Sequence, residues 1–274
     1  MILVPALAVL VSMAAVMVAA WAFGLARKNG GWTDVFWTWG TGATLGAAAL
    51  VPLMDGGAPE MRPLMVAAMV AIWTLRLGLF LTPRVASHPE DPRYAAFRAQ
   101  WGSRYALNML FVTLPQAPAS ALLALSVILA ARTTGPLGWR DAAGVAIFAA
   151  AIVGEAISDG QMKAFRAAGR AKGETAAVMD KGLWAWSRHP NYFFQWLGWV
   201  AYPVIALQPA WPVSWISLAA PVVMFGLLRY VSGVPPLETA MLASRGEKFR
   251  DYQRRVSAFF PRPPKVAPSP TNAA

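Results

Sequence analysis

Long apolar runs separated by short polar segments make up most of the chain. Residues 2–25 contain no charge and no Asn or Gln, and comparable runs cover 35–53, 62–81 and 106–131. A helix needs roughly 20 mostly apolar residues to cross a hydrocarbon core of about 30 Å. These runs therefore predict four membrane-spanning helices.

The second half of the chain adds further apolar runs. Residues 142–158 form a shorter one, and residues 191–228 carry no charge over their whole length. One helix over 191–228 would be about 57 Å long, too long for one crossing. The proline-containing segment 208–212 is the predicted turn between two helices. The pattern thus predicts an all-α integral membrane protein, a bundle of seven transmembrane helices whose fourth member bends at Pro115 and Pro118.

Basic residues indicate the orientation. Of the 24 Lys and Arg residues, nineteen fall in the first, third and fifth predicted loops and the C-terminal tail, against three in the opposite loops. Cytoplasmic loops carry an excess of Lys and Arg. We therefore expect a multi-pass protein with its N-terminus outside and its C-terminus in the cytoplasm.

Composition excludes several classes of protein. Charged residues make up 14% of the chain, with a net charge of +11, no Cys and only two His. Soluble domains average about 25% charged residues. The absence of Cys excludes disulfides, zinc–thiolate sites and thiol nucleophiles, and we expect no metal site. Because the positive charge gathers on the membrane's cytoplasmic side, it indicates a polyanionic small molecule and membrane lipid as partners, and no nucleic acid.

Four ionisable residues fall within or at the ends of predicted helices, all in the cytoplasmic half of the bilayer. They are Asp34, Arg76, Glu155 and Arg229. Charges at such depth usually face a wet cavity or one another, which predicts a polar vestibule entered from the cytoplasm. The alternative is that long side chains near helix ends extend to the interface.

The fifth predicted helix continues as a polar stripe. Asp159, Lys163, Arg166 and Arg170 fall at helical spacing, so they share one face of a helix that extends into the cytoplasm. The alternative is a solvated basic face that touches anionic lipid.

A second chemical signal lies at the start of the sixth predicted helix. Pro190 suits a first helical turn, and Arg188 and His189 directly precede it. Free N–H groups and the helix dipole make such a position an anion site. Asn191 and Tyr192 could hold an amide or ribose group, while ordinary helix capping is the alternative for His189 and Asn191.

Together these segments resemble a known family. Ser187-Arg188-His189-Pro190-Asn191-Tyr192 before an apolar helix, with Ser-Asp-x-Gln upstream at 158–161, resembles the bacterial steroid 5α-reductase-like membrane family, which is related to eukaryotic steroid and enoyl reductases. The Glu-Asp-Pro-Arg-Tyr motif at 90–94 matches the bacterial branch, and Asp34, Glu238 and Tyr252 also fit. The resemblance covers roughly residues 30–262.

The resemblance implies a membrane domain over residues 1–262 that holds NADPH in a cytoplasmic cavity, with a tail at 263–274 expected to be disordered. It also implies a bacterial inner-membrane location and a lipophilic substrate that enters from the lipid. The cofactor-binding half would be about 141–262. The implied cofactor contacts are Arg84, Asp159, Gln161, Lys163, Arg166, Arg188, His189, Asn191, Tyr192, Glu238 and Tyr252.

The chemistry implied by the resemblance is reduction of a carbon–carbon double bond conjugated to a carbonyl, in a steroid-like, isoprenoid or fatty substrate. An acid or hydrogen-bond donor must then stabilise the enolate oxygen. The chain lacks the Gln-Glu pair of the true steroid reductases in the second helix, and Leu81 occupies roughly the position of their tyrosine. Asp34 and Tyr94 are the candidate catalytic replacements.

Two other classes are possible. Membrane methyltransferases of the isoprenylcysteine or phospholipid type also show Arg-His-Pro-x-Tyr before a helix, and there Glu238, Tyr252 and Pro261 would serve S-adenosylmethionine. That family does not require the Ser-Asp-x-Gln and Glu-Asp-Pro-Arg-Tyr segments. A transporter or assembly factor is the third class, but transporters often show internal repeats and midplane sites, and neither is evident in this sequence.

Overall fold

The structure is a computed structural model that describes residues 2–54, 61–173 and 177–265. Helices form nearly all of this part of the chain, and it contains no strand. The α-helices are α1 (Leu3–Ala26), α2 (Trp32–Leu50), α3 (Met61–Ser87), α4 (Pro92–Trp101), α5 (Tyr105–Thr113), α6 (Gln116–Ala131), α7 (Trp139–Ala171), α8 (Pro190–Ala206), α9 (Ala219–Gly226), α10 (Val234–Arg245) and α11 (Glu247–Arg255). The short helices are η1 (Val51–Met54), η2 (Gly102–Arg104), η3 (Gly182–Ala185), η4 (Pro212–Leu218) and the π-helical η5 (Leu227–Val231).

Five stretches among these residues are long and apolar enough to cross a membrane. They are Leu3–Ala26, Met61–Ser87, Arg93–Ala131, Trp139–Ala171 and Pro212–Arg245. An all-helical protein with several candidate membrane spans is therefore confirmed.

Helices α2 and α8 also form, but neither is among the five stretches that are long and apolar enough to cross a membrane. Helix α2 carries Asp34 together with several threonines and glycines, and α8 has only 17 residues. Both fall short of the roughly 20 apolar residues that a crossing needs. The topology of seven spans stays a prediction.

Prolines set several boundaries where the sequence places them. Helix α8 begins at Pro190 and ends at Ala206, before the predicted turn. The fourth predicted helix breaks between α5 and α6 at Pro115, because proline cannot donate the next helical hydrogen bond. Helix α7 continues to Ala171, which confirms the predicted extension of the fifth helix.

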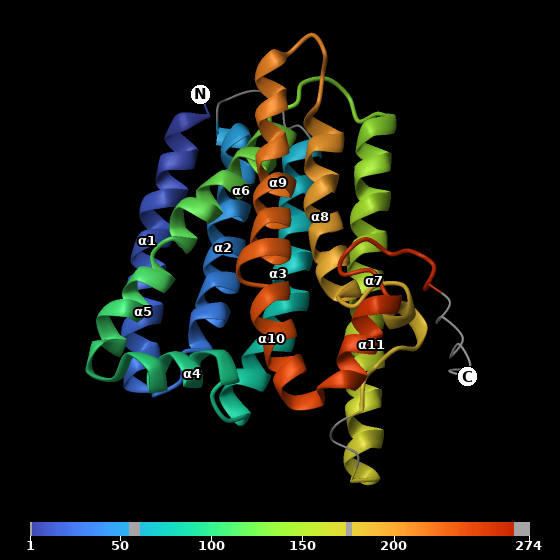
Figure 1. Cartoon of the computed structure of the whole chain (residues 1–274). Coiled ribbons are helices and arrows are strands. Elements are labelled where there is room, and N and C mark those ends of the chain that lie inside the picture. The colour runs from blue at the N-terminus through green and yellow to red at the C-terminus, as the bar shows by residue number, and fades with distance from the viewer. Residues whose placement is uncertain (1, 55–60, 174–176, 266–274) are drawn as a thin grey trace. The chain divides into compact units, whose positions relative to one another are not determined.

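The chain divides into two compact units, and each is described by itself. Unit 1 comprises Met1–Ala146 and Trp199–Val223. Within it α2 packs against α1 and α3, and α1 packs against α6 (Figure 1). Within this apolar core, polar side chains of α2 and α6 form hydrogen bonds with one another. The indole N–H of Trp37 donates to Ser120 Oγ at 3.0 Å, and Ser120 also bonds to Thr41 at 3.1 Å, which satisfies polar groups that hydrocarbon would leave unpaired.

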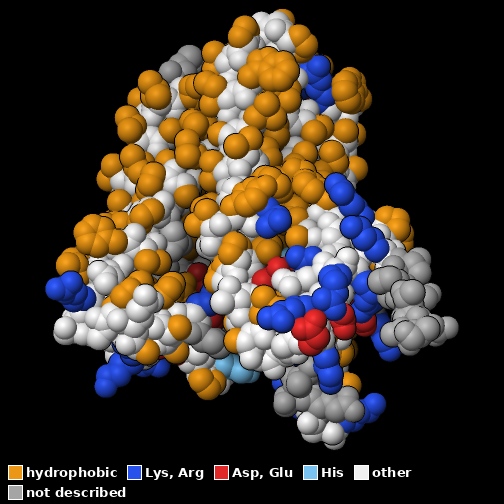
Figure 2. Space-filling view, in the orientation of Figure 1, with side chains coloured by type: hydrophobic (Ala, Val, Ile, Leu, Met, Phe, Trp, Pro, Cys, Tyr) orange, Lys and Arg blue, Asp and Glu red, His pale blue; other side chains and the backbone are white. Residues whose placement is uncertain are grey.

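Unit 2 comprises Ile147–Gly198 and Met224–Ala274. Two hydrogen bonds join the segment after α11 to the segment before α8. The Arg188 N–H donates to the Ser257 carbonyl at 2.8 Å, and the Ser187 hydroxyl donates to the Phe259 carbonyl at 2.8 Å. Phe259 and Phe260 pack there against aromatic rings of α8 and α9. Figure 2 shows Lys and Arg side chains gathered with acidic ones over α11.

The single-domain prediction for residues 1–262 stays a prediction. Residues 263–265 of the predicted tail follow α11 without regular structure, and the Lys265 N–H donates to the Arg255 carbonyl at 2.9 Å. Residues 266–274 of that tail lie outside the described residues.

Candidate functional site

The first polar cluster lies in unit 1, at the start of α4. Asp91 is the N-cap of this helix, and its Oδ1 accepts hydrogen bonds from the N–H and the Nε of Arg93, both at 3.0 Å. Capping by Asp satisfies a donor that the first helical turn leaves open. Burial alone would raise the pKa of Asp91, but the hydrogen bonds from Arg93 outweigh it and hold that pKa below its usual value.

Asp34 joins this cluster from the first turn of α2. The Tyr94 hydroxyl donates to Asp34 Oδ1 at 3.1 Å, and Arg93 Nη2 donates to Oδ2 at 3.3 Å. The guanidinium of Arg84, at the end of α3, lies 4.0 Å from Asp91. The structure thus brings the two predicted catalytic residues together, with one predicted cofactor residue beside them.

The position of Tyr94 depends on a glycine in the turn between α1 and α2. A Cβ added at Gly30 would lie 2.6 Å from Cγ of Tyr94, so only glycine lets the ring pack this closely. Glu90 fixes the same turn, since its Oε1 accepts from the Gly30 N–H at 2.7 Å and from Arg98 Nη2 at 2.9 Å. Tyr94 is buried as a result.

The second polar cluster lies in unit 2, around the start of α8. The carboxylate of Glu238, from α10, accepts four hydrogen bonds. Arg188 donates from Nε at 2.7 Å and from Nη2 at 3.1 Å, His189 from Nε2 at 2.9 Å, and Gln253 from Nε2 at 2.7 Å. Arg188 Nη1 donates to the carbonyls of Gln253 and Val256. A bidentate arginine with further donors fixes the carboxylate in one geometry.

His189 is held in one protonation state by this arrangement. Only 2% of its surface is exposed. Burial lowers the pKa of His189 and outweighs the opposite effect of Glu238. A neutral ring that donates from Nε2 keeps a lone pair on Nδ1, and Nδ1 has no hydrogen-bond partner among the described residues. The ring of Tyr192 stacks on His189, with centroids 5.5 Å apart.

A small cavity lies beside this cluster, wholly within unit 2. Its volume is about 30 Å³, enough for a water molecule or two. Three arginines and three of the aromatic residues that line it bear on what it could bind. They are Arg166, Arg188, Arg245, Trp184, Phe249 and Tyr252. Burial raises the pKa of Tyr252, so its phenol stays protonated and donates to the Trp184 carbonyl.

The predicted cofactor contacts belong to both units. Arg84 belongs to the cluster of unit 1, whereas Arg188, His189, Tyr192, Glu238 and Tyr252 meet in unit 2, where Arg166 lines the cavity. Asn191 lies half-buried in the first turn of α8, and Asp159 lies half-buried on α7. Lys163 is exposed, and Gln161 lines a different pocket, described below.

Sequence reasoning missed several members of both clusters. Arg93 bonds both Asp91 and Asp34. Its place between Asp91 and Tyr94 in one motif is the sequence feature that could have indicated this role. Arg245 and Gln253 reach the second cluster from α10 and α11. No local pattern distinguishes them from the other polar residues of the basic tail.

What these clusters can do chemically follows from their charges. The cavity of unit 2 presents positive side chains and flat aromatic walls, which together suit phosphate groups attached to a ring. The cluster of unit 1 presents a tyrosine hydroxyl bonded to a carboxylate, an arrangement that can hold or deliver a proton.

Comparison with known proteins gives one match. No curated protein and no solved structure matches the chain. The family described as "Protein of unknown function (DUF1295)" matches residues 20–256. That match covers both clusters and most of the chain, and the chain therefore belongs to the DUF1295 family.

Proposed function

We propose that this protein is a membrane-embedded, NADPH-dependent reductase of a carbon–carbon double bond conjugated to a carbonyl in a lipophilic substrate. The steroid 5α-reductase-like motifs of the sequence support the reaction class. The observation that carries the proposal is the basic cavity of unit 2, with His189 buried at its edge.

The residues around the cavity fit a phosphorylated dinucleotide. Arg166 and Arg245 supply positive charge, and the first turn of α8 supplies N–H groups that favour an anion. Nδ1 of His189 is a buried acceptor without a protein partner among the described residues, so a ligand hydroxyl or amide could satisfy it. Trp184 and Phe249 offer faces for stacking. Since the cavity holds only water-sized volume, these walls must move apart to admit a dinucleotide.

In this proposal NADPH, when bound, supplies the hydride for the β-carbon of the substrate. The proton comes from the chain's own residues. Tyr94 Oη is the proposed donor to the substrate oxygen. Asp34 Oδ1 accepts the single phenol proton at 3.1 Å before substrate binds, and the hydroxyl then rotates to pass that proton to the substrate oxygen. Arg93, whose Nη2 donates to Asp34 Oδ2 at 3.3 Å, holds that carboxylate in place.

A second candidate is an S-adenosylmethionine-dependent methyltransferase. One observation favours it, because the residues that its motif requires are directly connected. Arg188 and His189 both bond to Glu238, and Tyr252 bonds to the carbonyl just before them. The sulfonium of S-adenosylmethionine carries a positive charge, however, and Arg166 and Arg245 beside the cavity disfavour it relative to a polyphosphate.

The two candidates separate in a thermal-shift experiment on the full chain in detergent. NADPH should raise the melting temperature, and S-adenosylmethionine should raise it less. Arg166→Ala and Asn191→Ala should lose the NADPH shift, while Arg250→Ala, an exposed arginine of α11, should keep it. A larger shift with S-adenosylmethionine would favour the methyltransferase. A shift that both site variants retain would remove the cofactor assignment.

We also propose that α2 and α8 complete a bundle of seven crossings, with the N-terminus outside and the C-terminus in the cytoplasm. The chain contains no Cys, so single-cysteine variants report topology without background. Ser103→Cys, between α4 and α5, should react with a membrane-impermeant maleimide only from the cytoplasmic side. Thr134→Cys, between α6 and α7, should react only from the opposite side, and the reverse pattern would overturn the orientation.

A further inference from the structure

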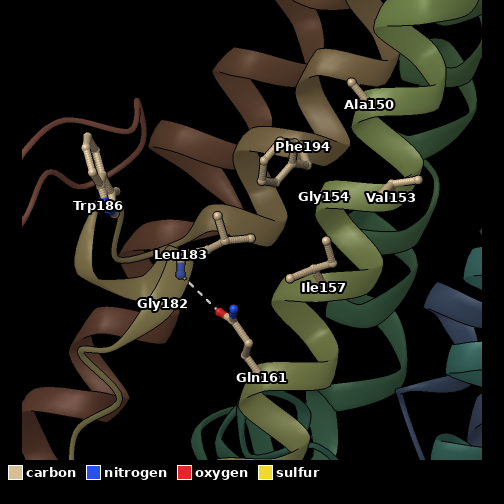
Figure 3. A pocket seen from close by; sticks show the side chains of 9 residues that line it. All are labelled: Ala150, Val153, Gly154, Ile157, Gln161, Gly182, Leu183, Trp186 and Phe194. Atoms are coloured by element: carbon tan, nitrogen blue, oxygen red, sulfur yellow. Dashed lines mark hydrogen bonds between the residues drawn. The ribbon is translucent and has the colours of Figure 1, made fainter.

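An apolar groove of about 560 Å³ runs along one face of α7 in unit 2 and is open along one side (Figure 3). Ala150, Val153, Ile157 and Gln161 line it from α7, at a spacing that places them on a single helix face. Leu183 and Phe194 form the opposite wall. The proposed reaction leaves this groove unused.

The shape of the groove depends on close backbone packing. A Cβ added at Gly154 would overlap the ring of Phe194, so glycine lets that ring lie directly against α7. At one end the side chain of Gln161 accepts a hydrogen bond from the Leu183 N–H at 3.0 Å, which closes the groove with a polar group (Figure 3). The groove thus has one polar end and otherwise apolar walls.

The length of the groove matches half a bilayer. Ala150 and Gln161 are eleven residues apart, which is about 16 Å along a helix. The hydrocarbon core is about 30 Å thick, so one leaflet accounts for about 15 Å. The groove lies on the candidate membrane span Trp139–Ala171, and Val153 in its wall is 56% exposed. A hydrocarbon chain of one leaflet would therefore cover this wall.

Two basic residues lie next to residues that line the groove. Lys181 directly precedes Gly182, which lines the groove, and the Arg262 N–H donates to the carbonyl of Trp186, another lining residue, at 2.9 Å. The side chains of Lys181 and Arg262 are exposed. The neighbouring Asp180 pairs with Arg255 at 3.3 Å, so its charge is already balanced. An anionic headgroup at the groove would meet these two exposed cations.

We propose that the groove binds one acyl chain of an anionic phospholipid, whose phosphate lies beside Lys181 and Arg262. The site is distinct from the cofactor cavity, because Met162 and Arg166 line that cavity from another face of α7. The segment between α7 and α8 separates the two, with Trp184 on the cavity and Leu183 on the groove. The proposal does not depend on which cofactor the cavity takes.

Native mass spectrometry of the full chain, loaded with phosphatidylglycerol or phosphatidylcholine, tests the chain-binding part. The wild type should retain one phosphatidylglycerol. Val153→Trp fills the groove at an exposed position and should lose it, whereas Val145→Trp, the same change at an exposed position of α7 outside the groove, should not. Equal lipid retention by both variants would overturn the proposal, and so would a lipid-free dimer whose contact Val153→Trp abolishes.

The charge part needs a second pair of variants that leaves the groove intact. Lys181→Gln with Arg262→Gln should reduce the preference for phosphatidylglycerol over phosphatidylcholine by roughly fivefold per charge removed. Lys248→Gln with Arg250→Gln removes two exposed charges of α11 and should leave the preference unchanged. If both double variants lower it equally, the headgroup position is wrong.

Discussion

Tyr94 and Asp34, sixty residues apart in sequence, share a hydrogen bond of 3.1 Å between the phenol and the carboxylate. The phenol is buried, whereas the Asp34 side chain keeps about a third of its surface exposed. The carboxylate fixes the phenol oxygen before any substrate arrives, and the phenol proton must turn from Asp34 to the substrate oxygen for general acid catalysis.

Tyr94→Phe should therefore lower the rate of substrate reduction by about 100-fold, the lower range for loss of a general acid. The thermal shift with NADPH should not change, because Tyr94 is not among the residues that line the proposed cofactor cavity. Oxidation of NADPH, followed at 340 nm with long-chain 2-enals, measures the rate. Tyr105→Phe is the control, since Tyr105 is also buried and bonds only to Arg98 among the described residues. Full activity of Tyr94→Phe would place the proton donor elsewhere.

The buried His189 predicts a pH dependence of stability. Its folded pKa lies below the unfolded value of about 6.5, so the folded state resists a proton that the unfolded chain accepts. Stability is then fully present above about pH 6.5 and decreases as pH falls from there toward the folded pKa, by up to about 1.4 kcal/mol per pH unit. Melting temperatures between pH 7.5 and 5.5 check this.

The two histidines of the chain supply their own comparison in that experiment. His189→Asn should flatten the melting temperature between pH 6.5 and 5.5, whereas His88→Asn, at an exposed position, should retain the decrease. A decrease that persists in His189→Asn would mean that another group takes up the proton.

The ion pair between Arg62 and Asp141 predicts a large loss of stability. Arg62 is 4% exposed, and it bonds to both oxygens of Asp141, from Nε at 2.7 Å and from Nη2 at 2.9 Å. It also donates to the backbone carbonyls of Gly135 and Pro136. Arg62→Met would leave the carboxylate buried without its partner, which costs about 3–5 kcal/mol.

Chemical denaturation in mixed detergent measures this loss. Arg250→Met removes an exposed partner of Glu247, and the expected effect there is below about 1 kcal/mol. A similar loss in both variants would show that burial of Arg62 adds nothing.

Local sequence rules predicted the elements that local physics determines. The start of α8 at Pro190 and the break at Pro115 follow from the geometry of proline, and α7 extends because Asp159, Lys163 and Arg166 keep helical spacing. The count of seven spans stays a prediction. Helices α2 and α8 form, but their length and polar content fall below what hydropathy alone requires of a span.

The site residues show where such rules stop. Asp34 and Tyr94 are the predicted catalytic residues, and the structure places them in contact. The four donors on Glu238 come from two segments, Arg188 and His189 before α8 and Gln253 on α11, and nothing in the sequence near Gln253 indicates that it reaches Glu238. The sequence also does not predict the groove along α7. Val153 and Ile157 look like ordinary apolar residues of a membrane span, and only the fold places Leu183 and Phe194 opposite them.

Two glycines on α2 give a matched pair that tests helix packing in unit 1. A Cβ added at Gly42 would overlap the side chain of Thr74 on α3, whereas a Cβ at Gly46 would meet nothing nearer than 4.0 Å. Gly42→Ala should therefore destabilise the protein by about 1–3 kcal/mol through overpacking. Gly46→Ala should be neutral or stabilise it by up to about 1 kcal/mol, because alanine loses less backbone entropy in a helix.

The double variant separates this clash from a general effect of alanine at position 42. Thr74→Ala removes the atoms that the new Cβ would meet, so Gly42→Ala should cost much less stability in that background. Among the described contacts, the Thr74 hydroxyl bonds only to the Val70 carbonyl of its own helix. Thr74→Ala alone should therefore cost little stability. Melting temperatures of the four proteins in one detergent form a double-mutant cycle. Additive losses would mean that α2 and α3 do not meet at Gly42 and Thr74.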